Sequence, residues 1–208
     1  ILTHGDDKGL KLPPKIAPIQ LVIIPIYKTI EQEELIKDYI NDLVVEWKSS
    51  KIRIYEDWAD STPGFKFNKW EMKGVPLRLE VGLRDVEKNN IVLARRDTGE
   101  KVFLPKVDAI KKVPDLLTSI QGNLFSQALQ FREKNTHVVN RYDELKKIIK
   151  EGGFVRCGWD GKSSTESKIK EETKATIRCI PLNENPKDLK CIYSASPAKH
   201  EVIFAKAY

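Results

Sequence analysis

The side chains of this chain best suited to chemistry gather in one stretch, PGFKFNKWEMKGVPLRLEVGLRD, at residues 63–85. The stretch combines aromatic rings, cations and carboxylates just before a run that is typical of a strand. Guanine carries acceptors on one edge and donors on another, so a protein that reads it needs Arg or Lys for the first edge and a carboxylate for the second. This stretch and the hairpin expected after it supply such a set: Glu71, Arg78, Arg84 and Lys101.

Glu80 is a second carboxylate that could serve the same purpose. It follows Arg78 by two residues, so both lie on one face of the expected strand. We favour Glu71 as the carboxylate for the base, and Glu80 as a structural partner of Arg78 or of a neighbouring strand. Unpaired RNA bases also stack on aromatic side chains, and the nearby aromatics are Phe65, Phe67 and Trp70. Composition alone fits equally well an ordinary amphipathic helix with one charged face in water.

Two other groups of residues suggest metal binding at first sight. The first group lies near the N-terminus: His4, Asp6 and Asp7. These are typical ligands, but without a distant fourth one they fit a turn better. The second group is the three cysteines: Cys157, Cys179 and Cys191. Structural zinc usually takes its four ligands as two close pairs, and three irregularly spaced cysteines also make no disulfide framework, which favours reduced thiols in a cytoplasm.

The net charge is positive but leaves the partner open, since basic chains bind nucleic acid, acidic membranes or nothing in particular. The chain has 208 residues, 40% of them apolar, with a net charge of +6. Residues 61–113 hold 12 Lys and Arg against 7 Asp and Glu. No apolar run approaches the ~20 residues of a membrane span and no leader is visible, so we expect a soluble, cytoplasmic protein without a membrane partner. The start at Ile1 suggests a piece of a longer protein.

The pattern of apolar residues predicts alternating strands and helices. Residues 20–26 are typical of a buried strand, a capping box at Thr29 and Gln32 opens a helix that extends to Trp47, and a strand at 52–55 completes a β-α-β unit. We then expect a helix at 65–73, a strand at 75–81, a hairpin at 91–95 and 101–104, and a helix at 114–132. After a polar boundary at 133–140 we expect helices at 142–150 and 166–173 and strands at 154–159, 175–180 and 202–206. Two small α/β units fit this order better than one large sheet.

Several segments resemble prolyl-tRNA synthetases of the archaeal and eukaryotic type. Residues 63–85 are similar to their anticodon-binding domain, and THGDDKGLKLPPKIAP (3–18) to the end of the catalytic domain and the entry to the anticodon domain. ATIRCIP (175–181) and PAKHEVIFAKAY (197–208) are similar to the C-terminal extension. The resemblance implies an α/β fold, in which a class II synthetase anticodon-binding domain, a mixed sheet flanked by helices, precedes a small α/β C-terminal domain. The implied limits are 1–18 for a catalytic-domain remnant and linker, 19–133 for the anticodon-binding domain and 134–208 for the C-terminal domain.

The resemblance also implies roles for individual residues. In the family, the Glu of Trp-Glu, the Arg of Val-Pro-x-Arg, the basic residue before Asp and a hairpin Lys contact the anticodon. These motif positions are Glu71, Arg78, Arg84 and Lys101 here. Prolyl anticodons share guanines at their second and third positions, which this set suits. The family's final tyrosine reaches toward the active site, and the corresponding residue is Tyr208.

For the parent enzyme the resemblance implies proline–tRNA ligase activity, with a prolyl adenylate made from proline and ATP in the presence of Mg²⁺ and then transferred to tRNA. In the family, the motifs that hold ATP lie upstream of the position of Ile1. We therefore expect this chain alone to be inactive, with no catalytic residues and no cofactor of its own. The expected partners are the anticodon loop of tRNA(Pro), the catalytic domain of the parent and the second subunit of a homodimer.

Many relatives carry a four-cysteine zinc site in the C-terminal domain. Where two of those ligands would stand, this chain has Thr165 or its neighbours and Tyr193 or Ser194. Cys179 falls outside the ligand positions, and we expect it in the core. We therefore expect no zinc, and instead stabilisation by apolar packing of four residues: Trp159, Ile169, Ile177 and Phe204.

Two other functions remain as alternatives. A non-catalytic module of the same fold could bind another RNA or a protein. An independent enzyme acting on a small molecule is disfavoured, because the sequence contains no nucleophile elbow, phosphate-binding loop or pair of catalytic carboxylates.

Overall fold

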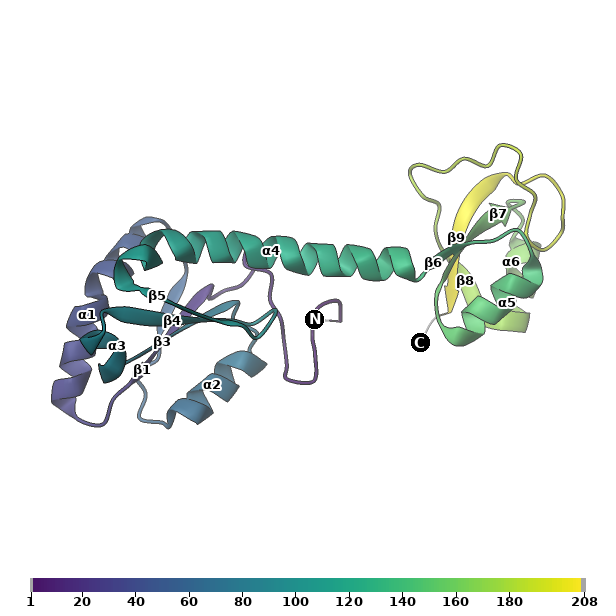
Figure 1. The fold of residues 1–208 in the computed structure, drawn as a ribbon. Helices are drawn as coiled ribbons and strands as arrows, with labels where there is room; N and C mark the ends of the chain where they lie inside the picture. Colours follow the sequence, from purple (N-terminus) through teal and green to yellow (C-terminus); the bar gives the residue numbers. More distant parts are fainter. Residues whose placement is uncertain (1, 207–208) are drawn as a thin grey trace. The chain divides into compact units, whose positions relative to one another are not determined.

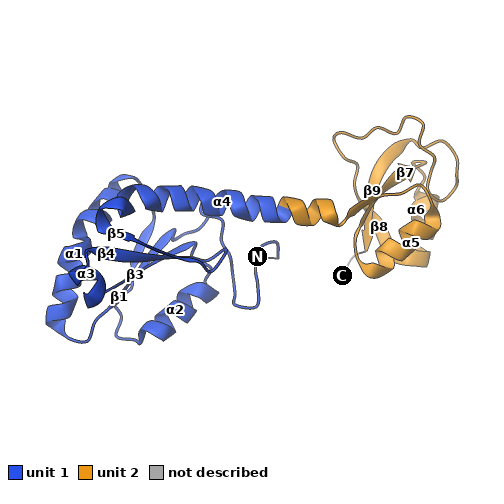
Figure 2. Ribbon diagram, viewed as in Figure 1, with its two compact units in different colours: residues 1–128 blue, residues 129–208 orange. Residues whose placement is uncertain are grey.

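The structure is a computed structural model that describes residues 2–206. It divides into two compact units, residues 1–128 and 129–208 (Figure 2). The limit between the units lies inside helix α4 (Ala109–Lys134), before the position predicted from the sequence, residues 133 and 134. Residues 2–18, which were predicted as a separate remnant and linker, belong to the first unit. Each unit has its own sheet and its own apolar core.

The first unit is built on a mixed five-stranded sheet with strand order β2-β1-β3-β4-β5. The strands are β1 (Leu21–Ile26), β2 (Ile54–Glu56), β3 (Leu77–Gly82), β4 (Asn90–Arg95) and β5 (Lys101–Pro105). Strand β1 runs parallel to β2 and β3, whereas β4 is antiparallel to both β3 and β5. The predicted β-α-β start and the hairpin around residues 96–100 are therefore confirmed.

Helices cover the two faces of this sheet unequally (Figure 1). Helices α1 (Ile30–Ser49) and α4 pack on one face, where they form the main core with the alternate strand residues Leu21, Ile23, Leu77, Leu79, Ile91 and Leu93. Helix α2 (Pro63–Met72) lies on the other face, where Trp70 packs with Val22 and Ile24 of β1. Strand β1 is thus buried on both sides, as its unbroken apolar run predicts.

The register of the strands places two rows of side chains on the face that carries α2. Strand partners put Val22, Arg78, Ala94 and Lys101 in the first row. The same pairing puts Ile24, Glu80, Val92 and Phe103 in the second row. Because α2 packs on β1, the polar members of both rows lie beside this helix rather than beneath it.

The second unit is a smaller α/β structure with the strand order β6-β7-β9-β8. Its strands are β6 (Thr136–Val138), β7 (Phe154–Trp159), β8 (Ala175–Cys179) and β9 (His200–Lys206). Its helices are α5 (Tyr142–Glu151) and α6 (Ser163–Thr173). The core includes Ile169 and Phe204, with Trp159 and Ile177 packed against it. The apolar packing expected of these four residues is confirmed.

The sequence prediction missed three short elements and the start of one long helix. The missed elements are β6, helix α3 (Leu83–Glu87) and a single 3₁₀ turn, η1 (Lys106–Asp108). Helix α4 was predicted to begin at Pro114 but begins at Ala109, so the proline lies inside it and leaves the Ile110 carbonyl without its helical donor. Along the described residues, no helix is both long and apolar enough to cross a membrane.

Candidate nucleic-acid interface

Glu80 brings together two of the predicted base-reading residues. Its Oε1 accepts hydrogen bonds from Nε and Nη2 of Arg78, at 3.0 and 2.8 Å, and its Oε2 accepts one from Nζ of Lys101 at 2.7 Å. Only 9% of the Glu80 side chain is exposed, against 43% for Lys101. The carboxylate is therefore a buried anchor with two cations in front of it, which confirms its expected pairing with Arg78.

Phe67 supports the same two cations from α2. The Arg78 guanidinium lies over its ring at 4.4 Å from the centroid, and the Lys101 ammonium lies at 5.6 Å. Such contacts contribute about 0.5–2 kcal/mol each, depending on how far the cation is desolvated. Arg78 is thus held between an aromatic ring and a carboxylate, a preorganised arrangement for a residue that would present its remaining donors to a base.

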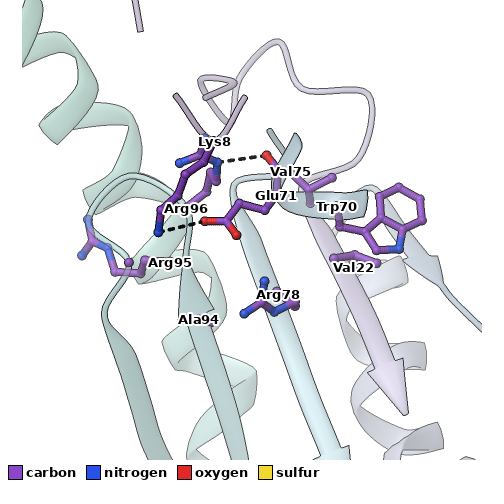
Figure 3. A pocket seen from close by; sticks show the side chains of 10 residues that line it. Lys8, Val22, Trp70, Glu71, Val75, Arg78, Ala94, Arg95 and Arg96 are labelled. Atoms are coloured by element: carbon purple, nitrogen blue, oxygen red, sulfur yellow. Dashed lines mark hydrogen bonds and ion pairs between the residues drawn. The ribbon is translucent and has the colours of Figure 1, made fainter. Parts of the chain in front are cut away.

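A cavity of about 210 Å³ adjoins this cluster and is lined by both Glu71 and Arg78 (Figure 3). Glu71 stands near the end of α2, and its carboxylate lies 3.5 Å from the ammonium of Lys8. Lys8 is 70% exposed and held by this one ion pair, so it can be displaced at little cost. The structure therefore brings Glu71, Arg78 and Lys101 together at one end of the sheet.

Arg96 ties the N-terminal segment to the wall of this cavity. Its Nε donates to the carbonyl oxygen of Glu71 at 3.0 Å, while Nη1 and Nη2 donate to the two carboxylate oxygens of Asp6 at 3.0 and 2.6 Å. The hydrogen bond from Arg96 holds the pKa of Asp6 well below its usual range. Asp6 is thus the ion-pair partner of Arg96. The pair helps to fix the N-terminal segment, which brings Lys8 to Glu71.

Arg95 is a further lining residue that the sequence analysis did not single out. Its Nε and Nη2 bind the two oxygens of Asp97 at 2.9 and 2.7 Å, and Asp97 also accepts from Nδ2 of Asn123 on α4 at 2.7 Å. These bonds, with one from Arg95 Nη1 to the Ser119 hydroxyl at 3.1 Å, direct the guanidinium toward α4, on the sheet face opposite Arg78. The signal in the sequence is the doublet of arginines before Asp-Thr-Gly, a turn placed next to an expected strand.

The three aromatics near this site have different roles. Trp70 is buried, and its indole N–H donates to Asp57 Oδ2 at 2.6 Å, so it belongs to the core and is not free to stack on a base. Phe67 is covered by Arg78 and Lys101, as described above. Phe65 is exposed on the outer side of α2. The expectation that all three could stack on RNA is therefore wrong for Trp70.

Arg84 does not join the other predicted residues. It follows the carboxyl end of β3, in the short helix α3, whereas Arg78 lies near the start of the same strand. It lines a different cavity of about 530 Å³, together with Ile26, Gly82 and Asp85. Asp85 accepts the Gly82 backbone N–H at 2.9 Å and fixes the turn between β3 and α3. A contact by Arg84 would have to reach a different part of a bound RNA.

Comparison with known proteins identifies both units. Residues 20–116 match the family of anticodon binding domains, and residues 142–208 match the family described as prolyl-tRNA synthetase, C-terminal. The chain carries an anticodon binding domain and the C-terminal domain of prolyl-tRNA synthetases. Over its whole length it is 46% identical to a proline–tRNA ligase of Flavobacterium psychrophilum, of which it covers 43%. It is 45% identical to that of Chloroflexus aggregans and 43% identical to that of Roseiflexus sp., covering 44% of each. The chain thus spans less than half the length of these curated relatives.

The second unit holds a polar network at the positions where zinc-binding relatives were expected to place ligands. The hydroxyls of Thr165 and Ser194 both donate to Asp160 Oδ2, each at 2.9 Å. Cys157 and Cys191 are buried beside this network, and burial, with a smaller effect of Cys191, raises the pKa of the Cys157 thiol to about 12. Because the two hydroxyls are engaged with a carboxylate, only the two cysteines remain as ligands, fewer than the four that structural zinc takes.

Three further predictions from the sequence concern a possible metal group and two single residues. Among residues 2–206, no group of three or more His, Cys, Asp or Glu side chains is arranged to hold a metal ion, and this covers the neighbourhood of Asp6. Cys179 was expected in the core but is exposed at the end of β8, next to an irregularity in the pairing with β9, so that expectation is wrong. Tyr208, the residue expected to reach an active site, lies outside the described residues.

Proposed function

We propose that this chain is the tRNA-reading part of a proline–tRNA ligase and that it recognises guanine in the anticodon of tRNA(Pro). The observation that carries the proposal is the convergence of Glu71, Arg78 and Lys101 on one end of an anticodon-binding domain. A base that enters the cavity meets guanidinium donors from one strand and a carboxylate from a helix. This is the donor and acceptor pattern that distinguishes guanine from adenine.

The roles of the residues follow from their remaining hydrogen-bonding capacity. Arg78 uses Nε and Nη2 for Glu80, which leaves the donors of Nη1 for O6 or N7 of guanine. Among the described residues the Glu71 carboxylate is engaged only with the exposed Lys8, so it can accept the N1 and N2 donors once Lys8 moves aside. Glu80 has both oxygens occupied, which supports Glu71 as the carboxylate that contacts the base.

The reaction of the whole enzyme is also part of the proposal. The parent would join proline to tRNA(Pro) in the cytoplasm, as a homodimer, with ATP and Mg²⁺ bound in its catalytic domain. The contribution of this chain would be to hold the anticodon, with Arg84 at a second point of contact and Tyr208 directed to the catalytic domain. Zinc would take no part.

Binding to anticodon stem-loops tests the proposal directly. We expect fluorescence anisotropy to show tight binding to a prolyl stem-loop and weaker binding when either shared guanine is replaced by adenine. Arg78→Ala should cost about 1–3 kcal/mol of binding free energy and reduce the discrimination between the two bases. Arg141→Ala, which removes an exposed arginine from the second unit, is the matched control and should change neither.

The opposite result is equally informative. Equal binding to all loops, with affinity that depends only on salt, would indicate contacts to phosphates alone. Guanine recognition would then be rejected, and a general interaction module of the same fold would replace it.

A further inference from the structure

Phe103 is an exposed aromatic side chain on the sheet face that carries the guanine-reading residues. It lies on β5, the edge strand of the first sheet, and 73% of the residue is exposed. Its neighbours in the strand, Val102 and Leu104, contact the main core on the opposite face. The alternation of a strand therefore directs Phe103 and Lys101 to the face of Arg78.

Phe103 lies one step away from the proposed guanine site. It belongs to the row of Glu80 and Val92, and the adjacent row holds Arg78 and Lys101. Same-face residues of one strand are about 7 Å apart, so the ring of Phe103 is next to the cations rather than beneath them. Val92, which lies between Glu80 and Phe103 in this row, is buried and apolar.

Two of the three other aromatic rings near the site are already engaged, and the third, Phe65, is exposed on the outer side of α2. Arg78 and Lys101 cover the ring of Phe67, and Trp70 is buried against β1. Single exposed apolar residues are common on proteins. Phe103 differs from such residues because it stands on a sheet face beside two cations, the combination with which proteins hold single-stranded RNA.

We infer that Phe103 is a base-stacking residue, and that its ring receives the unpaired base at the first anticodon position, next to the guanines. The inference rests on the proposed function and adds a second nucleotide to it. Prolyl anticodons share only their second and third bases, so the site for the first base has to accept any base. A stacking ring meets this requirement, because every base has a π-face and stacking needs no hydrogen-bond pattern.

Stem-loops with an abasic first anticodon position test the inference. Phe103→Leu keeps an apolar side chain of similar size but removes the ring, and we expect about tenfold weaker binding to loops with any of the four bases at that position. Phe103→Tyr keeps the ring and should bind like the wild type. On the abasic loop, wild type and Phe103→Leu should bind equally. Phe125→Leu, a change of an exposed phenylalanine on α4, is the matched control and should leave all affinities unchanged.

Two outcomes would overturn the inference. One is wild-type affinity of Phe103→Leu for the intact loops, and the other is an equal loss on intact and abasic loops, which would exclude stacking at that position. Neither outcome tests the proposed recognition of the guanines. Failure of guanine recognition would appear separately, as equal binding of the wild type to loops in which guanine is replaced by adenine.

Discussion

Glu80 fixes the direction of Arg78 through two hydrogen bonds to a single carboxylate oxygen, at 3.0 and 2.8 Å from Nε and Nη2. The other oxygen is bound to Lys101 at 2.7 Å. The three side chains come from β3 and β5 and meet above Phe67 of α2, so the sheet, its edge hairpin and the helix all contribute. Glu80 is a positioning residue, since it holds the cations that would contact the base.

Glu80→Gln should therefore reduce base discrimination more than it reduces affinity. Glutamine has the same shape but one acceptor oxygen, so it can satisfy only one of the two cations. We expect the preference for guanine over adenine stem-loops to fall about tenfold, a change of about 1.4 kcal/mol. Affinity for RNA in general should be kept or rise slightly, because the change removes one negative charge. Anisotropy titrations at two salt concentrations separate these effects.

Glu87→Gln is the matched control for this change. Glu87 is an exposed carboxylate of the same unit, at the end of α3, and its replacement removes the same charge. The general affinity should rise as it does for Glu80→Gln, with no loss of discrimination. If both variants discriminated between the bases as well as the wild type, the positioning role of Glu80 would have to be abandoned.

Asp6→Asn should destabilise the first unit, because it breaks the ion pair with the buried Arg96. A hydrogen-bonded charge pair of this kind contributes about 1–2 kcal/mol when one partner is partly exposed, as Asp6 is. Urea unfolding at pH 7 measures the loss. Asp7→Asn provides the control: this neighbouring carboxylate is exposed and has no ion-pair partner in the part of the chain that the structure describes, so stability should not change.

The pH dependence of the stability loss in Asp6→Asn tests whether the ion pair with Arg96 causes it. Arg96 lowers the pKa of Asp6 in the folded state, so the ion pair contributes fully above the carboxyl pKa of the unfolded chain, about 4. Below that pH the contribution declines until the lowered pKa is passed. The difference in unfolding free energy between wild type and Asp6→Asn should be constant from pH 7 to 5 and shrink below pH 4. A difference that stayed constant at pH 3 would exclude this ion pair as its source.

Most of the strands and helices could be predicted because the apolar residues of each element recur at the spacing of a strand or of a helix. The strand at 154–159 and the start of the first long helix are examples, the helix with apolar residues on one face and a cap at Thr29. Strand β6 was missed because three residues in a polar stretch form a strand only through pairing with β7. The early start of α4 was missed because proline ended the predicted pattern, while Ala109 and Val113 pack in the core.

The sequence predicted which residues form the site but not all of the contacts between them. Arg78 and Glu80 share a strand face two residues apart, and this spacing alone indicates contact. By contrast, Lys8 reaches Glu71 because long-range contacts fix the N-terminal segment, among them the bonds of Arg96 to Asp6, 90 positions apart, and of the Leu10 N–H to the Met72 carbonyl oxygen. Such a pair leaves no periodic signal in the sequence.

Asp160→Ala should destabilise the second unit by about 1–3 kcal/mol. Burial alone would raise the pKa of this carboxyl, but hydrogen bonds from the Lys162 backbone and the Ser194 and Thr165 hydroxyls hold the pKa below its usual range. The change removes the shared acceptor and leaves those donors without a partner. Thermal unfolding measures the loss, with Asp143→Ala, at an exposed position on α5, as the control with little effect.

Zinc content distinguishes this network from a metal site. The purified chain should contain much less than one zinc per chain by elemental analysis, and a chelator should leave the unfolding temperature unchanged. A stoichiometric zinc, or a lower unfolding temperature with chelator, would show that Cys157 and Cys191 hold a metal and that the network is secondary.

Arg84 and Arg78 should act independently, because about 13 Å of strand separate Arg78 from the turn before Arg84. If both contact the anticodon loop, they contact different nucleotides, and the free-energy losses of Arg84→Ala and Arg78→Ala should add to within about 0.5 kcal/mol in the double variant. Arg78→Ala and Glu80→Gln share one ion pair, so their effects on the discrimination between guanine and adenine should be less than additive in the double variant. Anisotropy titrations of the wild type, the three single variants and the two double variants measure both cycles. A strong coupling between Arg84 and Arg78 would mean that RNA binding brings the two ends of β3 to a common nucleotide, which the separate cavities of the free chain do not allow.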